Sequence, residues 1–216
     1  MSRERPRVLV ATFNPGKARE IRRLLAAAGA ETLTLSDLGI RGPFAETGGT
    51  YEENARGKAA HYAAPAGIAT LADDSGLEVE ALGGRPGVLS ARYGGPDLDD
   101  AARCRLLLRE MAGLPEERRT ARFVAVAALA LPGRPEARLF RATCSGRIAE
   151  EPRGARGFGY DPIFFYPPFG ATFGEIDDDR KDRVSHRGLA FAAVETFLRT
   201  SEGADFLRAG RRDPAG

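Results

Sequence analysis

The stretch VLVATFNPGKAREI, residues 8–21, decides the fold class of this chain. Its apolar and β-branched beginning, RVLVAT over residues 7–12, predicts a short buried strand, and the following Asn-Pro-Gly predicts a tight turn. From Gly16 onward apolar residues recur at helical spacing, so we expect a helix over residues 16–29 with Gly29 as its stop. A strand, a tight turn and a helix in this order open an α/β unit.

The turn after this strand has the features of an anion site. The start of the following helix presents unpaired backbone N–H groups and the positive end of the helix dipole. Lys17 falls in the first helical turn, where a cation is unfavourable unless an anion lies nearby. The turn is not a Walker A loop, because positions 11 and 18 hold alanine where that pattern requires Gly and Ser or Thr. An ordinary strand–helix connection with a surface lysine is the alternative.

The composition predicts a soluble, cytoplasmic protein of one domain or two closely joined lobes. The chain has 216 residues, 43% of them hydrophobic, and a formal net charge of +2, which argues against binding of long nucleic acid. No apolar run reaches the roughly 18 residues that a membrane span needs, and the basic start leads into a strand rather than a signal-peptide core. Cys104 and Cys144 are too few for a disulfide framework or a zinc site.

The scarcity of lysine and asparagine is informative. Only three of the 32 basic residues are lysines, and the chain has two asparagines and no glutamine. A GC-rich coding bias explains most of this, but a lysine that remains marks a place that needs a compact ammonium group. These residues are Lys17, Lys58, Lys181, Asn14 and Asn54. All five fall within stretches that carry chemistry of their own.

The rest of the chain alternates between predicted strands and helices. We expect strands over residues 31–39, 68–82 with a turn inside it, 121–132, 136–148 and a short aromatic one within 152–168. We expect helices over residues 50–64, 97–114 and 184–200. The chain is therefore predicted to form a single α/β domain over residues 1–200, followed by a polar and frayed tail over residues 201–216.

Carboxylates in two of these stretches suit a metal ion. Asp73 and Asp74 end a predicted strand and point to opposite faces of it, so one is structural while the other faces a site. Glu46 lies in a glycine-containing loop before a helix that Thr50 and Glu53 begin with a capping box. Oxygens from Glu46 and Asp74 suit Mg²⁺, which shares its coordination shell with substrate phosphates. A simple Asp-Asp-Ser-Gly turn and a capped surface helix are the alternatives.

The stretch GFGYDP, residues 157–162, predicts a contact to a planar base. Gly157 and Gly159 allow close approach of the backbone to a ligand, and Phe158 and Tyr160 offer stacking surfaces. The stretch is not a dinucleotide fingerprint, because position 162 is proline where that pattern requires glycine. An aromatic turn in the core is the alternative.

The stretch KDRVSHRG, residues 181–188, brings polar groups to the start of the last predicted helix. Arg187 is a candidate donor to a carbonyl of a base, and Lys181 and His186 lie close to it in the sequence. Ser185 is a candidate helix cap. The alternative is a capped helix with a basic first turn.

Together these stretches resemble the inosine triphosphate pyrophosphatase family, also described as dITP/XTP pyrophosphatases. The matching segments are TFNPGK with Glu20, ETGGTYEENARGKA, ADDSGLEVEALGGRPGVLSARY, GFGYDPIFF and SHRGLA, in family order over residues 8–191. The resemblance implies Mg²⁺-dependent hydrolysis of ITP, dITP and XTP to the monophosphate and pyrophosphate, which cleanses the nucleotide pool. It also implies an elongated mixed β-sheet flanked by helices, two lobes with an active-site cleft between them, and a homodimer.

The same resemblance assigns roles to single residues. The triphosphate is held by Thr12, Phe13, Asn14, Pro15, Gly16 and Lys17, assisted by Lys58. Glu46 and Asp74 bind the metal, Asp74 is also the catalytic base, and Ser75 contacts the substrate. The nucleoside pocket consists of Phe158, Gly159, Tyr160, Asp161, Lys181, His186 and Arg187. Lys181 is assigned by its spacing to SHR, because FGEIDDDRKDR is richer in aspartate and arginine than is usual in the family.

Three other functions are compatible with parts of the pattern. The nearest is a pyrophosphatase that acts on another modified triphosphate, such as a pyrimidine nucleotide. A nucleotide sensor without turnover would not need Asp74, so the retained carboxylates disfavour it. A nucleic-acid-binding module is disfavoured by the near-neutral net charge.

Overall fold

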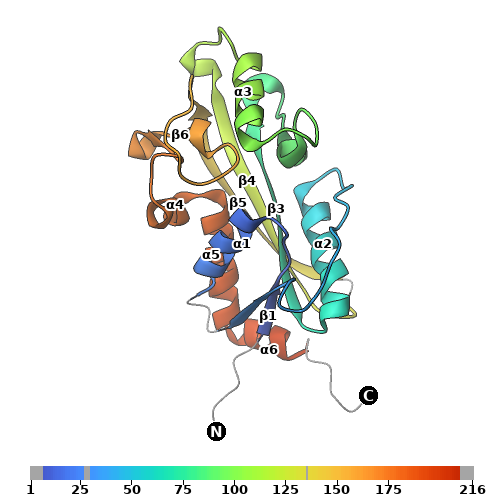
Figure 1. Ribbon diagram of the computed structural model, residues 1–216. Helices are drawn as coiled ribbons and strands as arrows, with labels where there is room; N and C mark the ends of the chain where they lie inside the picture. The colour runs from blue at the N-terminus through green and yellow to red at the C-terminus, as the bar shows by residue number, and fades with distance from the viewer. Residues whose placement is uncertain (1–6, 27–29, 135, 210–216) are drawn as a thin grey trace. The chain divides into compact units, whose positions relative to one another are not determined.

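The computed structural model describes residues 7–26, 30–134 and 136–209 (Figure 1). Its strands are β1 (Arg7–Val10), β2 (Glu31–Thr34), β3 (Ala69–Val79), β4 (Thr120–Ala130), β5 (Ala137–Ile148), β6 (Phe164–Tyr166) and β7 (Ala171–Thr172). Its α-helices are α1 (Pro15–Leu24), α2 (Tyr51–Ala66), α3 (Asp100–Glu110), α4 (Asp178–Val184), α5 (His186–Arg199) and α6 (Ser201–Ala209). Within the described ranges, no helix is long and apolar enough to cross a bilayer.

The strands form one mixed sheet in the order β2-β1-β3-β4-β5-β6-β7. β1 pairs in parallel with β2 and β3, whereas β6 pairs antiparallel with β5 and β7. In the β1–β3 register Val10 lies opposite Leu71, so the turn after β1 starts beside the stretch of β3 that carries Asp73 and Asp74. The predicted α/β class, with a mixed sheet flanked by helices, is confirmed.

The chain divides into two compact units. Unit 1 comprises the chain up to Asp74, Val126–Arg141 and the part from Leu189 onward, and unit 2 comprises Ser75–Ala125 and Ala142–Gly188. Strands β3, β4 and β5 each contribute residues to both units. Asp74 and Ser75 are consecutive in β3, and the boundary falls between them.

Unit 1 is built on the parallel strands. One apolar cluster joins β1, β3 and β4 to helices α1, α5 and α6, and it includes Val8, Val10, Ile21, Leu25, Leu71, Leu129, Phe191, Val194 and Leu207. Figure 1 shows α2 on the opposite side of β1 and β3 from α1 and α5. The segment expected as a frayed polar tail differs from the prediction, because residues Ser201–Ala209 form α6 and bury Leu207 in this cluster. Residues 210–216 lie outside the described part.

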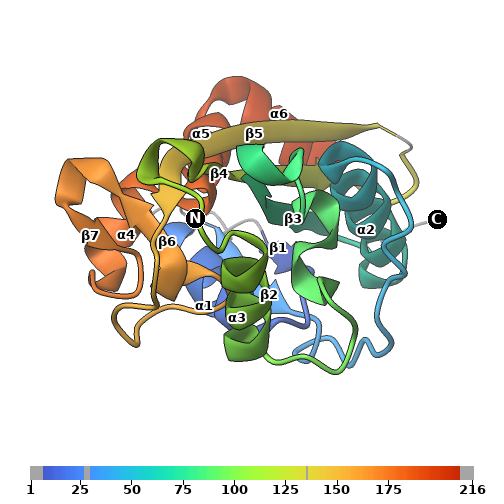
Figure 2. The same ribbon diagram turned by 90° about the horizontal axis from the view of Figure 1, so that it is seen from above.

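Unit 2 has a separate apolar cluster. It joins α3 to β6, β7 and the unit 2 parts of β3, β4 and β5, and it includes Leu77, Cys104, Leu107, Phe123, Phe164 and Phe173. The rings of Phe123 and Phe164 lie 4.5 Å apart between centroids. Figure 2 shows β6, β7 and α4 gathered at one side of this unit. Each unit therefore has an apolar core of its own.

Three predicted boundaries differ from the structure. α1 ends at Leu24, well before the stop expected at Gly29, which lies outside the described residues. The helix expected over residues 184–200 is two helices, because Ser185 is extended and its hydroxyl accepts the N–H of Gly188 at the start of α5. The turn expected inside residues 68–82 is absent, and β3 runs unbroken through Asp-Asp-Ser-Gly.

Candidate functional site

The turn after β1 is organised by Asn14, the N-cap of α1. Its side-chain oxygen accepts the N–H of Lys17 at 3.0 Å, and its own N–H donates to the hydroxyl of Thr12 at 3.2 Å. Pro15 occupies the first helical position, where a missing N–H has no cost. The cap therefore uses one of the N–H groups that the sequence interpretation had left for an anion.

Four predicted substrate residues line a pocket of about 430 Å³ in unit 1. Thr12, Phe13, Asn14 and Pro15 form one wall. The end of β2 and the segment after it supply most of the rest, through residues 34–36 and 39–41. Phe13 is 51% exposed, which is high for a large apolar side chain. Gly16 is buried in the first turn of α1.

Lys17 already has an anionic partner in the protein. Its ammonium lies 3.2 Å from a carboxylate oxygen of Asp73, which is fully buried. A cation in the first turn of α1 opposes the helix dipole, and the aspartate compensates it. The sequence interpretation required an anion beside Lys17, and Asp73 is the one present in the fold.

Lys58 lies on α2 and forms a close ion pair with Glu46. Burial disfavours the charged form of Lys58, but the carboxylates of Asp73 and Glu46 outweigh it, so the pKa of Lys58 stands above its usual value. The lysine therefore stays protonated. Glu46, predicted to be a metal ligand, lies in the same charged group.

Asp74 is 3% exposed and is held by Asn54. The amide nitrogen of Asn54 donates to Asp74 Oδ2 at 3.0 Å, and its oxygen accepts the N–H of Gly48 at 2.8 Å. Burial raises the pKa of Asp74 above its usual value, with Lys17 lowering it and Glu46 raising it. The sequence singled out Asn54 by its rarity but assigned it no role.

Glu46 and Asp74 fit a Mg²⁺ ion by their chemistry. The charge of Glu46 contributes to the raised pKa of Asp74, so the two carboxylates lie near enough to repel each other. Two carboxylates are a usual protein share for Mg²⁺, which takes its other ligands from water and phosphate oxygens. Among the described residues, no group of three or more His, Cys, Asp or Glu side chains is placed so that it could hold a metal ion.

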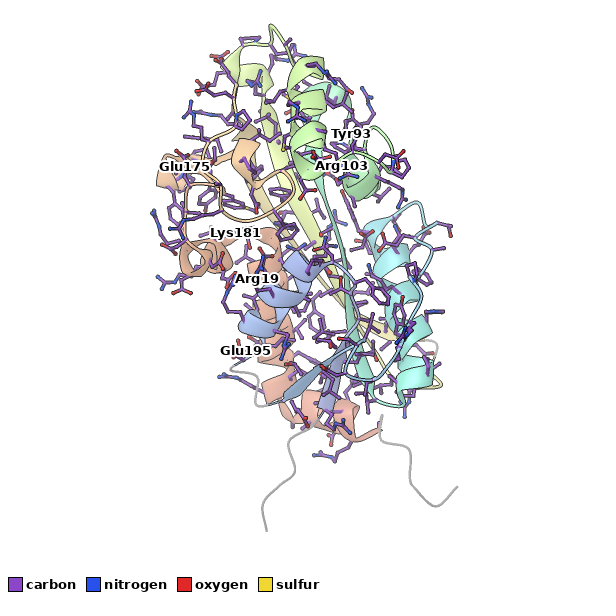
Figure 3. All side chains as sticks on the ribbon, in the orientation of Figure 1. Arg19, Tyr93, Arg103, Glu175, Lys181 and Glu195 are labelled. Carbon is purple, nitrogen blue, oxygen red and sulfur yellow. The ribbon has the colours of Figure 1, made fainter. Side chains whose placement is uncertain are left out.

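The predicted nucleoside residues gather in unit 2 around Phe158. The ammonium of Lys181 and the guanidinium of Arg187 lie 5.1 Å and 5.4 Å from the centre of its ring. Asp161 fixes the loop, since its carboxylate accepts the N–H of Phe158 at 2.8 Å and lies 2.5 Å from Lys181. Gly159 is held by its N–H, which donates to Asp100 at 2.7 Å. Figure 3 labels Lys181 on α4.

Arg187 and His186 are both buried at the start of α5. Arg187 donates to the hydroxyl of Ser75 at 2.8 Å, so two residues that the resemblance assigned to the substrate contact each other. The imidazole of His186 stacks on Phe123, with ring centres 4.5 Å apart. These contacts fix the orientation of both basic side chains.

Tyr160 requires a correction. The sequence interpretation offered its ring as a stacking surface, but the ring is 5% exposed and belongs to the unit 2 core. Its hydroxyl donates to the carbonyl of Ser90 at 3.0 Å, which satisfies its only polar group. Burial raises its pKa far above the usual value. Tyr160 therefore anchors the loop in the unit 2 core.

The predicted residues thus form two groups, one in each unit. Unit 1 brings together Lys17, Lys58, Glu46, Asp73 and Asp74, and unit 2 brings together Ser75, Phe158, Asp161, Lys181 and Arg187. The fold and these groups define an α/β protein with clustered acidic and basic side chains, and the unit 1 group lies at the turn after β1 and along β3, the strand that pairs with β1 in parallel.

Comparison with known proteins agrees with this description. The sequence model of the Ham1 family matches residues 8–197, and the chain belongs to this family. The dITP/XTP pyrophosphatase of Geobacillus kaustophilus is 48% identical over 188 residues, which cover 87% of this chain and 92% of that protein. A dITP/XTP pyrophosphatase of Thermus thermophilus is 51% identical over 189 residues, covering 87% of this chain and 89% of that protein.

A solved structure is also similar. The HAM1 protein from Coxiella burnetii has a TM-score of 0.81 and 37% identity, and the match covers 89% of this chain and 98% of that one. The family resemblance inferred from the sequence motifs is confirmed.

Proposed function

We propose that this protein hydrolyses non-standard purine nucleoside triphosphates, namely dITP, XTP and ITP, to the monophosphate and pyrophosphate. The proposal is supported by the names of relatives that are 43–51% identical over most of the chain. The observation that carries it is the group in unit 1, where two lysines and three carboxylates meet after β1 and along β3. Such a group suits a phosphate chain and its cation.

In this proposal each group binds one part of the nucleotide. The triphosphate is bound by the turn Thr12–Lys17 together with Lys58, whose ammonium groups lie where negative charge develops. The nucleoside is bound by Ser75 and by the Phe158 group of unit 2. The cleft between two lobes that the family resemblance implies stays a prediction.

The reaction proposed is attack of water on the α-phosphorus. The water oxygen bonds to phosphorus, the bond from phosphorus to the bridging α–β oxygen breaks, and pyrophosphate leaves with that oxygen. Asp74 accepts the proton from the attacking water, and its raised pKa makes it a stronger base than an ordinary aspartate. Mg²⁺ held by Glu46, Asp74 and phosphate oxygens would neutralise the charge that grows on the leaving pyrophosphate.

Base selection follows from the donors around Phe158. A 6-oxo purine presents an acceptor to a guanidinium such as that of Arg187, whereas adenine presents a 6-amino donor, which cannot accept a hydrogen bond from the guanidinium. A buried donor without a partner can reject the wrong ligand by about 10⁴–10⁵-fold. Phe158 adds stacking worth about 1–3 kcal/mol, which is indifferent to the identity of the base.

The proposal includes a cytoplasmic location, a homodimer and Mg²⁺ as the required ion. The homodimer and the Mg²⁺ requirement rest on the family resemblance of the sequence, and the cytoplasmic location rests on its composition. A nucleotide-pool enzyme acts on free nucleotides, so neither polymeric nucleic acid nor a membrane is a partner.

A nucleotide screen tests the function. The purified protein is incubated with dITP, XTP, ITP, dGTP, dATP and dUTP, with and without Mg²⁺, and pyrophosphate and inorganic phosphate are measured separately. We expect pyrophosphate from the 6-oxo non-standard purines in the presence of Mg²⁺. Preferred release from dUTP would favour the pyrimidine alternative, and binding without turnover would favour a sensor.

A further inference from the structure

Asn54 is a buried polar residue that the mechanism above does not use. It is 1% exposed and lies in the first turns of α2. One of only two asparagines in the chain, it occupies a stretch rich in candidate catalytic groups. Burying an amide costs free energy unless its hydrogen bonds are satisfied. The hydrogen-bond partners of Asn54 therefore indicate its role.

The amide of Asn54 uses both of its ends. Its oxygen accepts the N–H of Gly48 at 2.8 Å, and its nitrogen donates to Asp74 Oδ2 at 3.0 Å and to the Gly48 carbonyl at 3.4 Å. Only one orientation of the amide satisfies these partners, because the opposite one would set N–H against N–H and oxygen against carboxylate. The side chain therefore bonds both the N–H and the carbonyl of Gly48.

The loop to which Asn54 is hydrogen-bonded also carries Glu46. A Cβ atom at Gly48 would lie 2.7 Å from Asn54 Oδ1, so the loop can approach this closely only with glycine there. The carboxylate of Glu53 also accepts hydrogen bonds from the N–H groups of Gly49 and Thr50. The amide oxygen of Asn54 thus fixes the loop that carries Glu46, and its amide nitrogen fixes Asp74, the other carboxylate proposed to bind the metal.

We propose that Asn54 is a positioning residue that holds Asp74 and the Glu46 loop in register with each other. The inference rests on the function proposed above and adds a residue to that site. Asn54 does not contact the reacting atoms. Its hydrogen bond fixes which oxygen of Asp74 faces α2, and misplacement of a catalytic group by about 1 Å can cost about 100-fold in rate.

Two variants separate the two ends of the amide. Asn54→Asp keeps the shape and the acceptor for the Gly48 N–H but places an oxygen against Asp74. Asn54→Ala removes both contacts. Glu53→Ala is the matched control, since it frees other N–H groups of the same loop and weakens the start of the same helix without a contact to Asp74.

The measurements are kcat and KM for dITP, the Mg²⁺ concentration at half-maximal rate, and hydrogen exchange of the Gly48 amide. For Asn54→Asp we expect kcat to fall by about 100-fold, KM to stay near that of the wild type, and the Gly48 amide to stay protected. For Asn54→Ala we expect a similar loss of kcat, faster exchange at Gly48 and a higher Mg²⁺ requirement. Glu53→Ala is expected to unfold at a lower temperature with kcat close to the wild-type value.

The outcomes are decisive in either direction. Wild-type kcat in Asn54→Asp, or an equal loss of kcat in Glu53→Ala, would overturn the positioning role while leaving the proposed function intact. If the wild-type protein releases no pyrophosphate from any nucleotide with Mg²⁺, the function fails first and the inference falls with it. Should Asn54→Ala not fold, the isosteric Asn54→Asp variant still decides the question.

Discussion

At the scale of the residue, Asp74 is under opposing influences. Burial and the charge of Glu46 favour its neutral form, whereas Lys17, Lys58 and the hydrogen bond from Asn54 favour the carboxylate. The net result is a raised pKa. A general base works best when its pKa approaches the operating pH, so this raised pKa is consistent with the base role proposed for Asp74.

Asp74→Asn is expected to abolish most turnover while substrate binding survives. An amide cannot accept the proton from water, and loss of a general base costs about 10²–10⁴-fold in rate. Steady-state pyrophosphate release gives kcat, and calorimetric titration with dITP gives the affinity. Asp97→Asn on the exposed surface is the control. A kcat near that of the wild type would show that the base is another group.

The raised pKa of Asp74 also predicts how stability depends on pH in protein free of metal and nucleotide. Below the unfolded-state pKa near 3.8 the carboxyl is protonated in both states and costs nothing. As the pH rises through the higher folded-state pKa, the unfolded protein releases this proton more readily, so the wild type loses stability. Asp74→Asn lacks this titration, so its stability relative to the wild type should increase as the pH rises above about 3.8 and should level off above the folded-state pKa. Urea unfolding at several pH values measures it, and a difference independent of pH would contradict the cause assigned.

Arg187→Ala is expected to weaken both affinity and base selection. The guanidinium is 2% exposed and lies beside Phe158, and loss of one hydrogen bond from a charged donor lowers affinity by about 10–100-fold. KM for dITP should rise, and the ratio of kcat/KM between dITP and dATP should fall by a similar factor. Arg183→Ala, on the exposed side of α4, is the control. Unchanged selectivity would remove Arg187 from base recognition.

At the scale of the element, α2 depends on its capping box. Thr50 accepts the N–H of Glu53 at 3.1 Å, and the Glu53 carboxylate accepts the N–H of Thr50 at 3.2 Å. This pair fixes where the helix starts. Asn54 and Lys58 lie one and two turns further along the same helix.

Thr50→Ala is expected to lower the free energy of unfolding by about 1 kcal/mol, the usual cost of a lost N-cap. Thermal or urea unfolding measures the loss. Thr196→Ala is the matched control, because Thr196 bonds only the carbonyl of Ala192 within α5 and is exposed; it should change stability by less than about 0.5 kcal/mol. Equal effects of the two substitutions would show that the cap contributes nothing special.

The elements show which features a sequence can predict. The capping box of α2 was predictable because Thr50 and Glu53 satisfy each other within four residues. The strand at β3 was predictable too, but its unbroken course was not, because the local preference of Asp-Asp-Ser-Gly for a turn is overridden by partners far away in the chain. Lys17 pairs with Asp73 and Asn54 bonds Asp74, and neither contact has a local signal.

The same distinction applies to the candidate site. The sequence named both groups of residues from its motifs, and the rarity of lysine and asparagine drew attention to five of the positions that the structure places in or beside them. It could not predict that Asp73 is the partner of Lys17, or that Tyr160 lies in the core rather than against a ligand. Both depend on which face of an element is covered, and distant segments of the chain decide that.

At the scale of the whole molecule, the two units have separate cores but share three strands. Leu129 belongs to the core of unit 1 and Leu107 to that of unit 2, and both are fully buried. β3, β4 and β5 pass through both units without interruption. Unfolding of one core would therefore destabilise strands that also form part of the other unit.

We accordingly expect the chain to unfold in one cooperative transition. Leu107→Ala and Leu129→Ala should each lower the free energy of unfolding by about 2–5 kcal/mol, through lost burial and the cavity left behind. In differential scanning calorimetry each substitution should shift the single transition as a whole. Leu189→Ala is the control, since that side chain is 42% exposed. Two transitions, with only one of them moved by each substitution, would mean that the units fold independently in spite of the strands they share.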